Sequence, residues 1–237
     1  MGSQMGFSGR IGNVIHYKMG DKYYSRSAPR KYTQTKASKA RAEIFGRASS
    51  IGAQIRNGLS SVIPNPSDRK MHGRLVADLF AWLQILSDNP TVKNNQPIFD
   101  PINSLNSEAV SLGSRWRIEA QVINPSPGLL EIKIPALDPK KAFIAPNGAV
   151  EVICKIATTV TDIVKLTSIG RYSTEVIYPL DDQEVAEQNI SIELPMPEGS
   201  LVVTGLALVY AEDKYYRKKF ITNNSFLPSK IIHSIYL

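Results

Sequence analysis

Residues 149–158 read AVEVICKIAT, and this stretch indicates the fold class of the C-terminal half of the chain. Polar Glu151 and Lys155 are interleaved with Val152, Cys154 and Ile156. A period of two is typical of a β-strand with one face on a core and the other in water. We therefore expect Cys154 to face the core, where apolar surroundings raise the pKa of a thiol and make it inert.

Seven further stretches between Trp116 and the C-terminus have the same character. They are residues 116–123, 129–137, 172–180, 190–194, 200–211, 215–222 and 230–237. The turns between them carry Pro, Gly, Asn and Asp, and no segment of helical period separates them. About eight short strands at this spacing predict an immunoglobulin-like antiparallel β-sandwich over residues 115–237, each strand having one face in water.

The preceding segment has the period of a helix. Between residues 35 and 58 the apolar positions recur every three or four residues, with Thr35 or Ser38 as N-cap and Gly58 as the stop. A second helix follows Pro66, capped by Ser67 or Asp68 and stopped at 89–90. These two helices predict a helical hairpin over residues 35–89, and residues 90–114 are interpreted as a linker.

The first 34 residues predict a basic arm that contains a β-hairpin. Residues 11–17 are rich in β-branched side chains, Gly20-Asp21 is a turn signal, and residues 23–26 can return as the second strand. A lone hairpin is marginally stable in water, so this one is expected to pack on something else. The fold class predicted for the whole chain is α+β.

Charge is distributed unevenly along the sequence. The 237 residues carry a formal net charge of +7, but residues 1–74 hold 14 Lys/Arg and 3 Asp/Glu, whereas residues 75–237 hold 14 and 18. A basic first third suggests an anionic partner, either nucleic acid or an acidic protein face, or docking on an acidic part of its own chain.

The densest part of this basic region interleaves cations with tyrosines. Phosphate contacts need Lys or Arg, and aromatic faces can stack on bases, so the region is a candidate surface for binding a partner or phosphates. The candidate residues are Tyr23, Tyr24, Arg26, Arg30, Lys31, Tyr32, Lys36, Lys39 and Arg41. No helix-turn-helix, RNA-recognition or zinc-finger pattern accompanies them.

Nothing in the sequence predicts catalysis. The single cysteine excludes a disulfide framework and a cysteine-built zinc site, and the three histidines lie far apart without metal-binding spacing. The sequence lacks a nucleophile elbow, a phosphate loop and a dinucleotide fingerprint. We therefore expect a non-enzyme without cofactor, metal or small-molecule substrate.

The sequence also carries no secretory signal and no apolar run long enough to span a membrane. The expected location is the cytoplasm, or an exported assembly that needs no such signal, and no membrane partner is expected.

The N-terminal segment resembles an uncharacterised bacterial family whose members begin with a G-x-x-G-x-V-V-x-Y-x-x-x-G-K-x-x-x-R-S-x-P-K hairpin and a T-x-A-Q-x-x-x-R-x-x-F helix. The positions that fit are Gly9, Gly12, Val14, Tyr17, Gly20, Lys22, Arg26, Ser27, Pro29, Lys31, Arg41 and Phe45. Ser38 and Lys39 stand where the family has its Gln. The resemblance covers roughly the first 60 residues and implies no activity, because the family has none assigned.

The favoured hypothesis is a non-catalytic structural or assembly protein that docks on a protein partner, or on further copies of itself, through its basic hairpin and helix. The alternative is a nucleic-acid-associated protein that binds phosphates through the same basic third. The sequence leaves both open.

Overall fold

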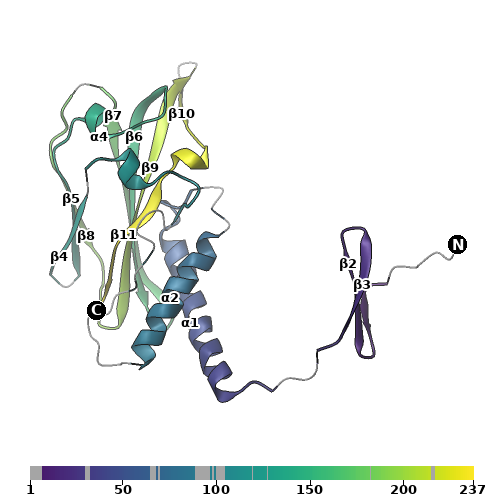
Figure 1. The fold of residues 1–237 in the computed structure, drawn as a ribbon. Helices are drawn as coiled ribbons and strands as arrows, with labels where there is room; N and C mark the ends of the chain where they lie inside the picture. The colour runs from purple at the N-terminus through teal and green to yellow at the C-terminus, as the bar shows by residue number, and fades with distance from the viewer. Residues whose placement is uncertain are drawn as a thin grey trace. The chain divides into compact units, whose positions relative to one another are not determined.

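The structure is a computed structural model, and it describes residues 7–29, 33–64, 68, 70–88, 97, 99, 105–118, 120–126, 128–181, 183–214 and 217–237. The chain divides into two compact units, Met1–Ala42 and Glu43–Leu237. Its fold class is α+β: a three-stranded N-terminal sheet, two long helices, and antiparallel sheets that include a curled half-barrel (Figure 1).

Three short strands form the N-terminal sheet, in the order β1 (Gly9–Ile11), β2 (Val14–Met19) and β3 (Lys22–Ser27). Gly12 and Gly20 lie in the two tight turns with φ of 56° and 63°, a conformation that other residues rarely adopt. The predicted hairpin with its Gly20-Asp21 turn is confirmed as β2 and β3. Strand β1 was not predicted from the sequence.

Two long helices follow, α1 (Lys36–Gly58) and α2 (Met71–Asp88). Thr35 Oγ1 accepts a hydrogen bond from the Ser38 amide at 3.2 Å, so the predicted N-cap is confirmed. The helices pack closely where α1 has Gly52, because a Cβ there would lie 3.3 Å from Val76 of α2. The predicted helical pair is therefore confirmed.

Each of the eight stretches predicted to be extended overlaps a strand, although only the last three residues of 116–123 lie in one. The strands are β4 (Gln121–Ser126), β5 (Leu129–Ile134), β6 (Ala149–Asp162), β7 (Thr167–Pro179), β8 (Gln188–Glu193), β9 (Ser200–Lys214), β10 (Arg217–Phe220) and β11 (Ser229–Tyr236). The short helices α3 (Leu112–Arg115), α4 (Pro139–Ala142) and η1 (Asn224–Phe226) lie between them in sequence.

Every strand pairing in these sheets is antiparallel. The large sheet has the order β10-β9-β6-β7, with β11 also paired to β9, and the small sheet has the order β4-β5-β8. Along β9, the strand β11 pairs with residues 201–207 and β10 with residues 211–214. The two strands therefore share one side of β9, and β6 takes the other.

The large sheet lies in the middle of three layers (Figure 1). One core fills the space between the two sheets and includes Cys154, Leu130 and Ile192. A second core joins the opposite face of the large sheet to the helices and includes Ile51, Leu79 and Val203. Both faces of β6 and β9 are consequently buried along most of their length.

This layering corrects the expectation that each strand exposes one face to water. The expectation holds for β5, whose residues alternate between half-buried and buried. It is wrong for β6 and β9, because α1 and α2 cover the face that the alternation assigned to solvent. The finer prediction of an immunoglobulin-like sandwich is not shown by this arrangement.

We call the larger unit, Glu43–Leu237, the body. Part of the predicted linker, residues 90–114, packs against the rest of it. The Leu105 amide donates to the Ser229 carbonyl at 3.2 Å, and Asn106 Nδ2 donates to the Leu227 carbonyl at 2.8 Å. Both Leu105 and Asn106 are buried. The predicted boundaries 1–34, 35–89, 90–114 and 115–237 stay predictions.

Candidate interaction surface

The N-terminal sheet has no buried core of its own. No described residue between positions 7 and 42 is buried, and several large apolar side chains in this range are substantially exposed. They are Phe7, Ile11, Val14, Tyr17, Met19, Tyr23 and Tyr24. Burying one such side chain contributes about 1.5–3 kcal/mol, so contact with a partner would stabilise this sheet substantially.

One face of the sheet carries a tyrosine pair beside an arginine. Tyr17 and Tyr24 are directly opposite in the β2–β3 register, and their rings stack with centroids 5.9 Å apart. The Arg26 guanidinium lies 5.9 Å from the Tyr17 ring centroid. Attraction between a cation and a ring holds such groups together at low entropic cost, which presents a flat aromatic surface with a positive edge.

The opposite face carries a second aromatic and cationic group. Lys18 Nζ lies 5.8 Å from the centroid of Tyr23, its neighbour across the strands. Next to them, His16 Nδ1 and Ser25 Oγ are 2.7 Å apart in a hydrogen bond, and the Phe7 ring packs edge-on against His16 at 6.1 Å. Both faces of this small sheet therefore present exposed aromatic rings beside cations.

The structure divides the sequence-predicted residues between several places. Tyr23 and Tyr24 are consecutive in β3, so they point to opposite faces and do not form one stacking platform. Arg26 joins Tyr24 on one face. Arg30, Lys31 and Tyr32 lie outside the described residues.

The three remaining candidates lie on the exposed first two turns of α1. A helix turns by about 100° per residue, so Lys36 and Lys39 share one side, whereas Arg41 lies about 160° around from Lys39. The cations of α1 therefore do not form a single line that could follow a phosphate backbone.

Sequence reasoning missed four members of this surface: Tyr17, Lys18, His16 and Phe7. The turn at Gly20-Asp21 fixes the register, and the register places Tyr17 opposite Tyr24 and Lys18 opposite Tyr23. Counting outward from that turn would have found the pairs.

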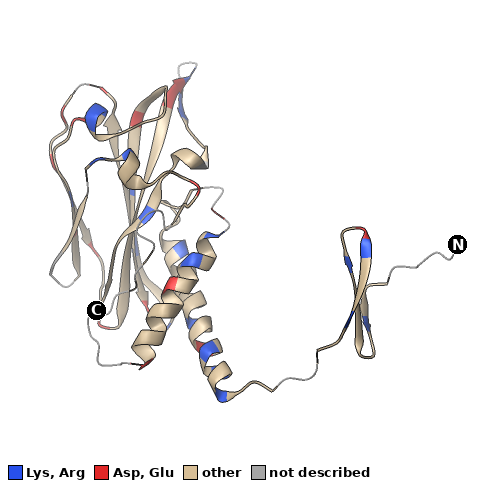
Figure 2. Cartoon of the chain, viewed as in Figure 1, with Lys and Arg blue, Asp and Glu red and all other residues tan. Residues whose placement is uncertain are grey.

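Figure 2 shows the charge of this region: the ribbon is blue, for Lys and Arg, at positions on β2, β3 and the start of α1, and red at the β2–β3 turn. Residues 1–42 hold nine Lys or Arg and one acidic residue, Asp21. The surface is thus cationic as well as aromatic.

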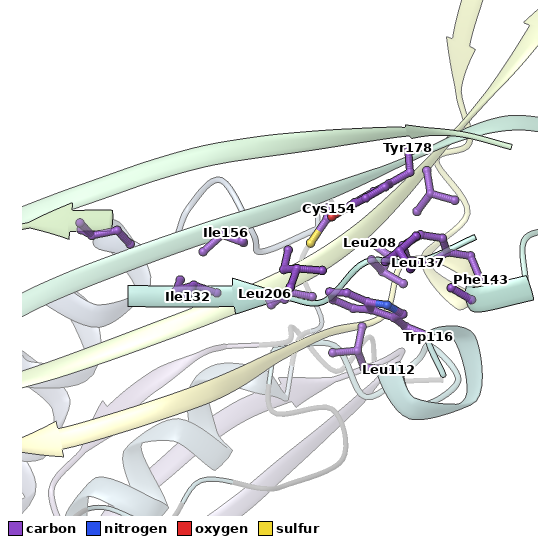
Figure 3. Packing of buried hydrophobic residues seen from close by; sticks show 14 of the residues in the cluster. Leu112, Trp116, Ile132, Leu137, Phe143, Cys154, Ile156, Tyr178, Leu206 and Leu208 are labelled. Atoms are coloured by element: carbon purple, nitrogen blue, oxygen red, sulfur yellow. The ribbon is translucent and has the colours of Figure 1, made fainter. Parts of the chain in front are cut away.

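The core between the two sheets holds the single cysteine, Cys154, and two buried tyrosines, Tyr178 and Tyr210. Cys154 is fully buried and faces that core as predicted, close to the aromatic group of Trp116, Phe143 and Tyr178 (Figure 3). Burial raises the pKa of the Cys154 thiol, and it raises the pKa of Tyr210 to about 12 against a smaller lowering by Arg115. These groups stay protonated near neutral pH, so the cluster acts as packing.

Surface hollows on the body bring few titratable groups together. One of about 360 Å³ lies between the end of α1 and strands β9 and β10, and Lys155 is the titratable residue in its lining. Within the described part of the chain, no group of three or more His, Cys, Asp or Glu is placed to hold a metal ion. Among the helices that the structure describes, none combines the length and apolarity needed to cross a membrane.

Comparison with protein-family models and with curated proteins gave no match to this chain. The resemblance of the first 60 residues to an uncharacterised bacterial family therefore stays a prediction.

Proposed function

We propose that this chain is a non-catalytic structural or assembly protein that docks through its N-terminal sheet, β1 to β3. The observation that carries the proposal is the exposure of aromatic rings on both faces of a sheet that buries no residue of its own. Exposed apolar side chains gathered beside cations are typical of a surface that is covered in an assembly.

The body supports this function by providing a separate, well-packed scaffold. Its two cores are built from residues at position 48 and beyond. We propose for its paired antiparallel sheets the immunoglobulin-like character expected from the sequence, since they enclose a shared apolar core. The family suggested by the N-terminal resemblance belongs to the same proposal.

The experiment compares the full chain with residues 35–237 by size-exclusion chromatography with light scattering. We expect the full chain to form assemblies larger than its 26.2 kDa monomer and residues 35–237 to remain monomeric, because the docking surface is removed. A full-length Tyr17→Ser/Tyr24→Ser variant should lose assembly as well. Equal masses for the full chain and residues 35–237 would contradict an assembly role for the sheet.

Nucleic acid is the second candidate partner, favoured by the cations that lie beside Tyr17 and Tyr23. If it is the partner, a labelled DNA or RNA fragment should bind at about 50 mM salt and be released steeply as salt rises, because phosphate contacts release counterions. Absence of binding at that salt concentration eliminates this candidate.

A further inference from the structure

Acidic residues gather in a segment of the body that contains no basic residue. Residues 172–213 include nine Asp or Glu and not one Lys or Arg, whereas residues 1–42 include nine Lys or Arg and one Asp. The same chain therefore carries two segments of opposite charge and similar magnitude. Such complementarity guides the choice and orientation of a partner.

The described acidic side chains of this segment are mostly exposed. Six of them belong to β7, β8 and the connections that follow each strand: Glu175, Asp181, Glu184, Glu187, Glu193 and Glu198. The other two described ones, Glu212 and Asp213, lie on β9, and β7 also carries one exposed cation, Arg171, just before this segment. Glu175 Oε2 lies 4.0 Å from Lys155 Nζ, and Glu187 accepts a hydrogen bond from Asn189. Contacts this weak and this exposed leave the carboxylates able to receive cations from another molecule.

Both strands also form the edges of their sheets. In the part of the chain that the structure describes, β7, a strand of 13 residues, pairs with β6 on one side only, and β8 pairs with β5 on one side only. A Cβ added at Gly170 of β7 would lie 3.1 Å from Leu194, just after β8, so the two edges approach each other there. An unpaired edge presents backbone N–H and C=O groups to an incoming strand.

The N-terminal sheet has the complementary features. Among the strands that the structure describes, β3 pairs only with β2; it carries Lys22 and Arg26, and the faces of the sheet hold the exposed tyrosines. A strand added to β7 would satisfy backbone groups of both partners, bring Lys22 and Arg26 toward carboxylates, and cover aromatic surface.

We infer that the N-terminal sheet of one copy docks on the acidic edge of a second copy, which we define as β7 and β8 with Glu175 and Glu193. This inference rests on the proposed function and names the partner: a further copy of this chain. Because the two surfaces differ, the contact is head-to-tail, and its repetition builds open-ended chains of copies or a ring.

Charge exchange between full-length variants tests the contact, with mass measured by sedimentation velocity after nuclease treatment at about 50 mM salt. The arm variant is Lys22→Glu/Arg26→Glu, and the edge variant is Glu175→Lys/Glu193→Lys. Each alone is expected to be monomeric. A one-to-one mixture should assemble as the wild type does, with the two variants alternating, because the wild-type arm meets the wild-type edge and the reversed arm meets the reversed edge. A chain with all four changes should assemble again for the same reason.

A matched control, Glu43→Lys/Asp88→Lys, makes the same change in net charge at exposed positions of α1 and α2, away from the acidic edge, and it should assemble as the wild type does. If the arm variant is monomeric but the Glu175→Lys/Glu193→Lys variant assembles as the wild type does, this inference is overturned while the proposed function stays intact. A monomeric wild type would also overturn this inference, and it is the result expected if the sheet binds nucleic acid or its own body. A mixture of the two variants that stays monomeric would overturn it as well. If residues 35–237 assemble as the full chain does, the proposed function itself fails.

Discussion

Replacing Gly58 with alanine should lower the free energy of unfolding by about 3 kcal/mol, near the upper end of overpacking effects. Gly58 is the last residue of α1, and it lies directly against Thr159 of β6. A Cβ at this position would overlap both Oγ1 and Cβ of Thr159. Rotating the threonine side chain moves Oγ1 but not Cβ, which the backbone of a central strand fixes, so the helix itself must shift.

Gly46 provides the matched control within the same helix. No atom lies within 4 Å of a Cβ added there, and the position is exposed. Gly46→Ala should therefore raise the free energy of unfolding by about 0.5–1 kcal/mol, since alanine restricts the unfolded chain and favours helix. Urea unfolding of both variants checks the pair. A loss of less than about 1 kcal/mol for Gly58→Ala would show that α1 does not approach β6 as closely as described.

Gly58 also shows what could and could not be predicted from sequence. Its place at the end of a helical pattern predicted the helix stop, and α1 ends there. Its φ is not in the left-handed region that a glycine C-cap would use, so its conformation does not require glycine. The requirement comes from a strand 101 residues away, and a local pattern carries no trace of that contact.

The faces of the strands illustrate the same limit. Alternation in residues 149–158 correctly placed Cys154 on the core between the sheets. The run at residues 201–211 is apolar except for Thr204, which is compatible with a strand buried on both faces, but it does not reveal which element covers the second face. Only the packing of α1 and α2 against that face decides it.

At the candidate surface, the kinds of side chain could be predicted from the sequence, but their grouping on the two faces of the sheet could not. The basic and aromatic character of residues 23–41 could be predicted, but grouping side chains by nearness in sequence placed Tyr23 with Tyr24 and overlooked Tyr17. Strand β1 escaped prediction because the glycine-rich stretch around Gly9 has low β-propensity, and its pairing depends on the turn at Gly12.

Asp68 anchors two segments of the body. The sequence predicted that Ser67 or Asp68 would cap α2, and Asp68 Oδ1 accepts a hydrogen bond from the Lys70 amide at 2.8 Å. The structure adds that Oδ2 accepts hydrogen bonds from Ser107 Oγ at 2.5 Å and the Ser107 amide at 3.2 Å, and forms an ion pair with Arg74 at 2.8 Å. One nearly inaccessible carboxylate therefore joins the start of α2 to residues 105–107.

We expect Asp68→Asn to cost about 2–3 kcal/mol of unfolding free energy at pH 7, because an amide oxygen is a weaker acceptor and its NH₂ group cannot accept. Burial by itself would raise the pKa of Asp68, but the hydrogen bonds from Ser107, Lys70 and Arg74 hold it well below the ordinary 3.8. A carboxyl group with a depressed pKa in the folded state stabilises above its unfolded pKa, near 3.9. That contribution is lost as the pH falls below this value toward the folded pKa.

The stability of wild type and variant should therefore differ most at neutral pH and converge in acid. Denaturant unfolding from pH 7 down to about pH 2 measures this convergence. Asp138→Asn is the control, because Asp138 also accepts a backbone hydrogen bond and pairs with a lysine, but on an exposed helix start where asparagine caps equally well. Its effect should be far smaller. A stability difference for Asp68→Asn that stays constant across this range would mean that the carboxylate charge is not what joins α2 to residues 105–107.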